Sequence, residues 1–116
     1  MAKEIGMSKT VRTYSHATRE AAQVLGKLIR LERKERKMTE ADLAARAGIS
    51  RTTLQKIEQG GLKCELGLVF EVATLVGVNL YGADTPSTVA LYHARINDRL
   101  ALLPHSIRAP KVDDEF

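Results

Sequence analysis

The chain has 116 residues, of which 44% are apolar, and it carries a formal net charge of +4. This length allows one modest core, and an aromatic content of 4% without tryptophan disfavours the base-stacking surfaces of single-strand binders. The charge is uneven, because residues 1–60 hold 13 Lys or Arg against 7 Asp or Glu, whereas residues 61–116 hold 5 against 7. A polyanionic partner is therefore expected at the N-terminal half.

Other classes of site find little support in the sequence. Cys64 is the only cysteine, which excludes an intramolecular disulfide and a cysteine-based zinc site. The three histidines lie far apart, and no nucleophile, base and orienting group fall at a recognised spacing. We therefore predict no enzyme, no metal site and no cofactor. Without a run of about 20 apolar residues or a signal-peptide core, a cytoplasmic protein with no membrane association is expected.

The first two segments are an arm and a long helix. Residues 1–14 lack apolar periodicity, which predicts a mobile arm whose basic residues can touch phosphates. From about Ser15 to Arg36, helical spacing of apolar residues predicts a long helix. Its core side is marked by Ala22, Leu25, Leu28, Ile29 and Glu32. Basic residues crowd its C-terminal end, where they also suit the helix dipole: Arg30, Arg33, Lys34, Arg36 and Lys37.

The segment 38–60, MTEADLAARAGISRTTLQKIEQG, predicts two short helices joined by a tight turn. Thr39 and Ser50 stand where N-caps belong, and Asp42 completes an S/T-x-x-D/E start signal. Gly48 has no Cβ and suits a left-handed turn position. One buried seam is shared by both helices and consists of Leu43, Ala44, Ala47, Leu54 and Ile57.

This segment resembles the helix-turn-helix of Cro and phage-repressor type regulators, also called the xenobiotic-response-element family. The resemblance implies an all-α, five-helix Cro/phage-repressor-like domain in which helix 2 crosses the DNA backbone and helix 3 enters the major groove. It also implies that Glu58 and Arg33 form a structural pair. Carried over by position, Ser50 touches phosphate, while the base edges or flanking backbone are met by Arg51, Thr52, Gln55 and Lys56.

The side-chain chemistry of the second short helix agrees with that assignment. Arginine can bind guanine and glutamine can bind adenine through two hydrogen bonds each. The alternative is that the same residues are simply the solvated face of an amphipathic helix. Further DNA contacts are predicted at Lys34, Lys37, Thr39 and Glu40.

Two of these positions depart from the family pattern. Glu40 replaces a glutamine that grips phosphate, and a carboxylate repels phosphate. Lys37 replaces a glycine that ends the long helix, so a non-glycine residue is expected to make the turn.

Two more helices are predicted downstream. After Gly60 and Gly61, the fourth helix contains Leu66, Val69, Phe70, Ala73 and Val76 and ends at Gly77. Thr85 and Pro86 begin the fifth helix, which carries a coiled-coil type stripe of Val89, Tyr92, Ile96, Leu100 and Leu103. The stripe either covers the domain's own core or meets a partner. A two-fold homodimer would satisfy both and would match half-sites about 34 Å apart on a palindromic operator.

The last segment cannot bury enough apolar surface to fold alone. We therefore divide the chain into an arm (1–14), a DNA-binding domain (15–103) and a flexible acidic tail (104–116). The end of the tail is either a solubilising segment or a docking peptide built from Val112, Asp113, Asp114 and Phe116.

The run LQKIEQGGLKCELGLVFEVATLVGV, an LLP step and the end VDDEF are similar to HipB-like antitoxins encoded beside HipA-type kinase toxins. This second resemblance implies an antitoxin that represses its own operon and binds a HipA-like kinase. The alternative is a phage-type or stand-alone repressor without a toxin partner.

Overall fold

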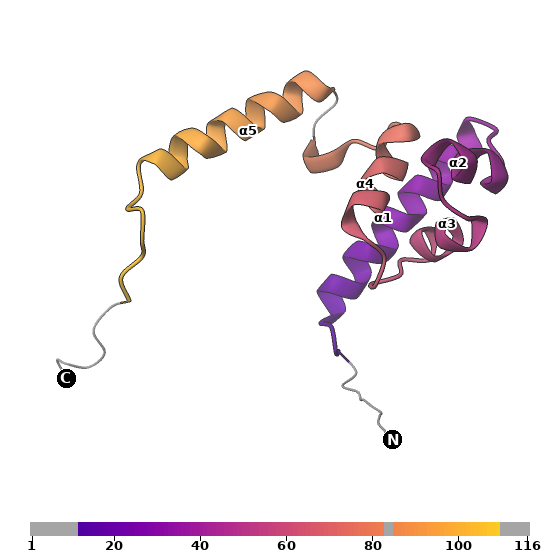
Figure 1. Cartoon of the computed structure of the whole chain (residues 1–116), viewed down its shortest axis with the longest axis horizontal. Coiled ribbons are helices and arrows are strands. Elements are labelled where there is room, and N and C mark those ends of the chain that lie inside the picture. Colours follow the sequence, from indigo (N-terminus) through magenta and orange to yellow (C-terminus); the bar gives the residue numbers. More distant parts are fainter. Residues whose placement is uncertain (1–11, 83–84, 110–116) are drawn as a thin grey trace. The chain divides into compact units, whose positions relative to one another are not determined.

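The computed structural model describes residues 12–82 and 85–109. In these ranges the chain forms five α-helices and no strand, which confirms the all-α prediction (Figure 1). The chain divides into two compact units, Met1–Val78 and Asn79–Phe116. Much of the predicted N-terminal arm and the tail residues Val112, Asp113, Asp114 and Phe116 lie outside the described residues.

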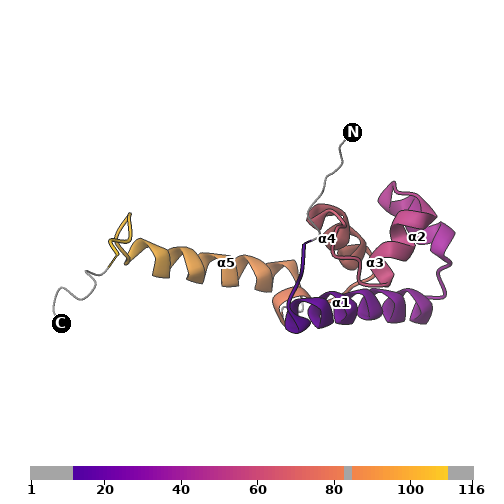
Figure 2. The same ribbon diagram turned by 90° about the horizontal axis from the view of Figure 1, so that it is seen from below.

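The first unit is built on the long helix α1, His16–Glu35. Ser15 caps it, because its side chain accepts a hydrogen bond from the Thr18 backbone N–H at 3.2 Å. Figure 2 shows α1 along one side of the unit, with α2, α3 and α4 on the other side. The residues that α1 buries are Gly26, Ile29 and Arg33.

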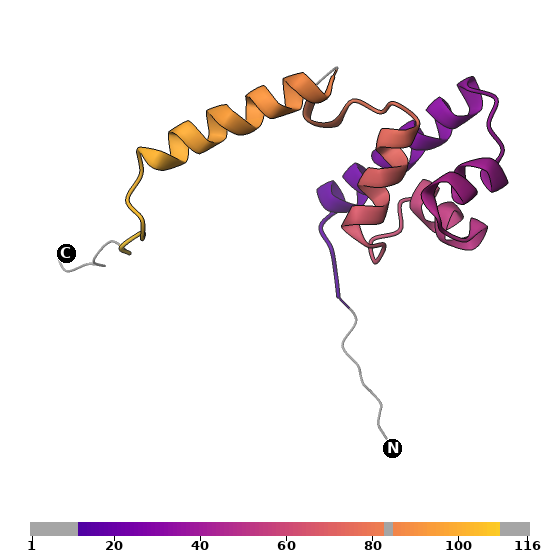
Figure 3. The same ribbon diagram turned by 45° about the horizontal axis from the view of Figure 1, so that its top comes forward.

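Three shorter helices complete this unit: α2 (Glu40–Ala47), α3 (Arg51–Glu58) and α4 (Leu66–Leu75). Figure 3 shows α2 and α3 next to each other. All four helices of this unit contribute apolar side chains to one core, with Ile29 from α1 and the other buried residues from the segments that follow. The buried apolar residues are Ile29, Leu43, Ala44, Leu54, Ile57, Val72, Ala73 and Val76.

Two of the predicted core positions are wrong. Leu28 is 40% exposed and Leu66 is 66% exposed. The buried face of α1 is formed by residues 26, 29 and 33, and Leu28 lies beside this face rather than on it. Leu66 is the first residue of α4, where the helix has not yet reached the core.

The second unit contains a short 3₁₀ turn, Leu80–Gly82, and the helix α5, Pro86–Ala101. The predicted start of α5 is confirmed, because Thr85 caps it through the Thr88 backbone N–H at 3.2 Å and Pro86 follows. The Tyr81 and Tyr92 ring centroids lie 6.3 Å apart. None of the α5 residues is buried.

Candidate nucleic-acid interface

The turn between α2 and α3 is set by two helix starts and one glycine. At the start of α2, the Thr39 hydroxyl accepts from Asp42 N–H at 3.0 Å, and the Asp42 carboxylate accepts from Thr39 N–H at 3.1 Å. This pair of hydrogen bonds is the predicted capping box. The bond that the Thr39 backbone N–H donates to the Asp42 carboxylate holds the pKa of Asp42 below its usual value. Gly48 ends α2 at φ 70° and ψ 34°, and Ser50 caps α3 through Thr53 N–H at 3.0 Å.

A buried ion pair fixes the far end of α3 against α1. Arg33 Nε donates to Glu58 Oε2 at 2.7 Å and Arg33 Nη2 donates to Glu58 Oε1 at 3.1 Å, so the pair is bidentate. Arg33 Nη1 also donates to the Met38 carbonyl at 3.0 Å. The hydrogen bond to Glu58 raises the pKa of Arg33, against the opposing effect of burial. One guanidinium thus joins the end of α1, the turn before α2 and the end of α3.

A glycine that the sequence analysis did not single out brings α1 and α3 together. A Cβ on Gly26 would lie 2.5 Å from the Ile57 carbonyl oxygen and 2.6 Å from that of Glu58. Any larger residue would therefore push α3 away from α1. The signal was available, because a glycine inside a strongly helical pattern costs about 1 kcal/mol and needs a packing reason.

With one face of α3 fixed in this way, its other face is open to solvent. Leu54, Ile57 and Glu58 are buried on the inner side. The outer side carries the predicted base-contacting residues: Arg51, Thr52 and Lys56 are exposed, and Gln55 is half-buried. The structure thus brings these four side chains onto the accessible side of one short helix.

The residues predicted to contact the DNA backbone lie at helix ends. Ser50 and Thr39 are exposed N-caps whose hydroxyls each accept a backbone N–H. The Ser50 hydroxyl also donates to Thr53 Oγ1 at 3.0 Å, so a contact from Ser50 to a phosphate would replace that hydrogen bond. Lys34 and Lys37 are exposed at the end of α1. Lys37 has φ 57°, so the expectation that a non-glycine residue makes this turn is confirmed.

Glu40 lies between the two short helices rather than facing solvent alone. Its Oε1 accepts from Gln55 Nε2 at 3.0 Å and is 3.4 Å from Arg51 Nη2. The hydrogen bond from Gln55, followed by that from Arg51, holds the pKa of Glu40 below its usual value and outweighs the effect of burial. The sequence did not reveal this link, because residues 40 and 55 become neighbours only after the turn folds.

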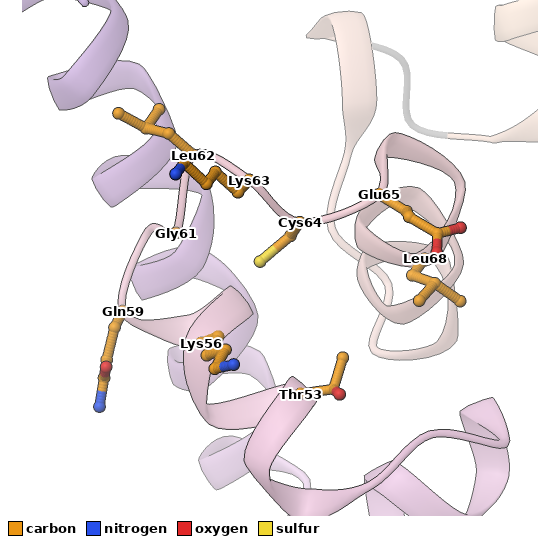
Figure 4. Close-up of a pocket in the computed structure, with 9 residues that line it drawn as sticks. All are labelled: Thr53, Lys56, Gln59, Gly61, Leu62, Lys63, Cys64, Glu65 and Leu68. Atoms are coloured by element: carbon orange, nitrogen blue, oxygen red, sulfur yellow. The ribbon is translucent and has the colours of Figure 1, made fainter. Parts of the chain in front are cut away.

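A hollow of about 630 Å³ lies beside α3. Figure 4 shows Thr53 and Lys56 on α3, Lys63 and Cys64 on the following loop, and Glu65 and Leu68 on the α4 side. Cys64 is half-buried, and an ideal Cβ on Gly61 would lie 3.0 Å from its sulfur. Two lysines line the hollow, Lys56 of the exposed α3 face and Lys63 of the loop that follows.

Within residues 12–82 and 85–109, no group of three or more His, Cys, Asp or Glu side chains could hold a metal ion. In the same ranges, no helix combines the length and apolar character needed to span a membrane.

Comparison with known proteins agrees with this geometry. Residues 29–81 match the protein family described as helix-turn-helix, and this range runs from the middle of α1 to the 3₁₀ turn. No match is found among curated proteins or among solved structures. Residues 29–81 are therefore similar to a helix-turn-helix of the Cro and phage-repressor type, and this similarity supports a DNA-binding transcriptional regulator.

Proposed function

We propose that the protein recognises a specific double-stranded DNA sequence by placing α3 in the major groove. The observation that carries this proposal is the division of α3 into a buried side, fixed by Leu54, Ile57 and Glu58, and an exposed side with polar and basic side chains. An eight-residue helix capped by Ser50 offers its N-terminal residues to a groove while its other side stays in the core.

The exposed residues fall into two chemical roles. Arg51 and Gln55 have the donors and acceptors to bind guanine and adenine, and Thr52 and Lys56 extend the same surface. Ser50, Thr39, Lys34 and Lys37 surround it and suit phosphate contacts, which position the helix without reading sequence. Glu40 contacts Gln55 and Arg51 and belongs to neither group.

The proposal is tested with duplexes selected by the protein from a library with a randomised core. We expect Arg51→Ala to weaken binding and to flatten base preference at one position, because one bidentate contact is worth about 1 to 3 kcal/mol. Lys34→Ala should weaken all sequences alike and lower the slope of log affinity against log salt by about 1. An Arg51→Ala protein with unchanged affinity and unchanged base preference would show that α3 does not read the groove.

The same proposal includes a homodimer formed through α5. Within α5 the apolar stripe consists of Val89, Tyr92, Ile96 and Leu100, whereas Leu103 of the predicted stripe lies two residues beyond the end of the helix at Ala101. Tyr92 and Leu100 lie four residues to either side of Ile96. In an antiparallel two-fold pair of α5 helices, Ile96 would meet the partner's Ile96 and Tyr92 the partner's Leu100. Each of these side chains is at least 39% exposed in the single chain, so its apolar surface is available to a second copy.

The proposed biological setting is an antitoxin that represses its own operon and binds a HipA-type kinase. This part is supported by the resemblance of about residues 15–116 to HipB-like antitoxins, which is weaker over the tail, and by the acidic tail with its two apolar residues, Val112 and Phe116. The test is co-purification with the kinase encoded beside this gene, with and without residues 110–116. A kinase captured equally well by both forms would argue against the docking role of the tail, and the absence of any kinase neighbour would favour a stand-alone repressor.

A further inference from the structure

Glu40 occupies an unusual position for an acidic residue in a DNA-binding surface. It is the first residue of α2, and a single oxygen of its carboxylate accepts from Gln55 at 3.0 Å and contacts Arg51 at 3.4 Å. Its side chain is 29% exposed, whereas that of Arg51 is 63% exposed. An anionic group therefore lies behind the two residues best suited to base edges.

The contacts with Glu40 leave the base-reading groups of both residues available. A guanidinium has five N–H donors, and Glu40 uses one at Arg51 Nη2. The Gln55 amide has two N–H donors and a carbonyl oxygen, and Glu40 uses one N–H. Arg51 therefore keeps a pair of N–H donors for guanine, and Gln55 keeps one N–H donor and its carbonyl acceptor for adenine. Glu40 can hold both side chains in place while they remain able to bind bases.

Glu40 affects correct and incorrect DNA differently through two separate effects. Its carboxylate opposes phosphate contacts, and this repulsion acts on every duplex alike. A correct sequence adds base contacts from side chains that Glu40 has already oriented, so less conformational freedom is lost on binding. The repulsion is thus compensated only where the bases match.

Resting on the proposed function, we infer that Glu40 is a specificity-determining residue, which orients Arg51 and Gln55 for base reading and weakens binding to duplexes that offer them no partner. Glu40 itself makes no base contact in this account. It sets the ratio of specific to non-specific affinity.

The experiment compares Glu40→Gln, Glu40→Ala and the control Glu71→Gln, which removes the same charge from an exposed position on α4. Each protein is titrated with the duplex selected by the wild type and with a scrambled duplex of equal length. We expect Glu40→Gln to bind the scrambled duplex about five- to tenfold more tightly, because one repulsive charge is removed. The gain on the selected duplex should be smaller, because a neutral amide oxygen makes weaker hydrogen bonds to Arg51 and Gln55 than a carboxylate does, so the specificity ratio falls.

Glu40→Ala removes the acceptor as well as the charge. Selection with this variant should yield weaker preference, by at least about fivefold, at the base positions that Arg51 and Gln55 read. A merely structural role at the start of α2 would lower the thermal midpoint and leave base preference unchanged. Glu71→Gln should leave the ratio of the two affinities unchanged.

The outcomes separate this inference from the proposed function. If the wild type enriches no sequence from the library, the proposed function fails. If the wild type enriches a sequence, and Glu40→Gln and Glu40→Ala retain the same ratio and the same base preferences, the role of Glu40 is overturned. A change in ratio as large in Glu71→Gln as in Glu40→Gln would overturn it too, because net charge alone would then explain the effect.

Discussion

The buried pair of Arg33 and Glu58 shows how single residues position α3 against α1. The side chains of Arg33 and Glu58 are 7% and 5% exposed, so little water reaches the bidentate contact. Burying two charges costs more than their mutual attraction returns unless the geometry is good and further hydrogen bonds are made. The additional bond from Arg33 to the Met38 carbonyl meets that condition and extends the contact to the turn before α2.

Breaking this pair from one side should be costly. We expect Glu58→Gln to lower the free energy of unfolding by about 3 to 5 kcal/mol, because Arg33 would keep a buried charge without its partner. Urea unfolding followed by circular dichroism measures the change.

The double variant Arg33→Met with Glu58→Leu is the control for this prediction. It removes both charges together, so its stability should lie well above that of Glu58→Gln. Equal loss in the single and double variants would show that packing, and not the unpaired charge, determines the effect.

Interactions between residues close together in the sequence were predicted better than contacts between residues far apart in it. Thr39, Asp42 and Ser50 were recognised as helix starts because capping depends on positions three residues apart. The contact of Glu40 with Gln55 spans 15 residues and the close approach of Gly26 to Ile57 spans two helices, so neither follows from a local pattern. The exposure of Leu28 likewise depends on where neighbouring helices lie.

At the scale of the elements, the helix ends define the domain. Three helices end at glycines in the left-handed region, Gly48, Gly60 and Gly77, and the end of α1 uses Lys37 instead. Around Lys37, the Met38 N–H donates to the Arg33 carbonyl at 3.1 Å and the Lys37 N–H donates to the Lys34 carbonyl at 2.9 Å. These bonds require the left-handed conformation, which costs a residue with a Cβ about 1 to 2 kcal/mol.

Replacing this lysine should therefore stabilise the domain. We expect Lys37→Gly to raise the free energy of unfolding by about 1 kcal/mol, which corresponds to about 4 to 8 °C in Tm for a domain of this size. The measurement is a thermal melt, with Lys37→Ala as the control because it removes the charge and keeps the Cβ. If the Tm of Lys37→Gly is no higher than that of Lys37→Ala, the left-handed conformation at position 37 does not destabilise the domain.

The starts of α1 and α5 were predicted closely, because each carries a capping side chain, whereas α5 ends at Ala101 and not at Leu103 as predicted. The expected helix from about Ser15 to Arg36 is α1, His16–Glu35, and Thr85 begins α5 as predicted. The role of α5 did not follow from the sequence, since an apolar stripe suits a core and a partner equally. That choice depends on the assembly of the whole molecule.

At the scale of the whole molecule, the proposed homodimer would bring two copies of the helix-turn-helix to one operator. A single helix-turn-helix reads only a few base pairs, and two related by a two-fold axis read a palindrome. The symmetric spacing of the α5 stripe about Ile96 matches that requirement, because an isologous contact needs the same surface on both copies.

A charge at the centre of the proposed contact should separate the copies. We expect Ile96→Asp to weaken self-association at least about 100-fold, because two apolar contacts are lost and two carboxylates meet. Sedimentation velocity over a range of concentrations measures the change.

Leu91→Asp is the matched control, since Leu91 lies on the same helix, is 51% exposed and falls outside the stripe. It should leave self-association unchanged. Equal behaviour of the two variants, or a wild type that stays monomeric at every concentration, would exclude this dimer.

The missing side chain at Gly26 also bears on how such a regulator could acquire new targets. Bare backbone at this point sets the depth at which α3 lies against α1, and that depth depends on inward-facing positions. Under the proposed function, the exposed residues Arg51, Thr52 and Lys56 can then be exchanged during evolution or by engineering without changing that depth. Retargeting to a different operator becomes a problem of a few outward-facing substitutions, provided that position 26 is left untouched.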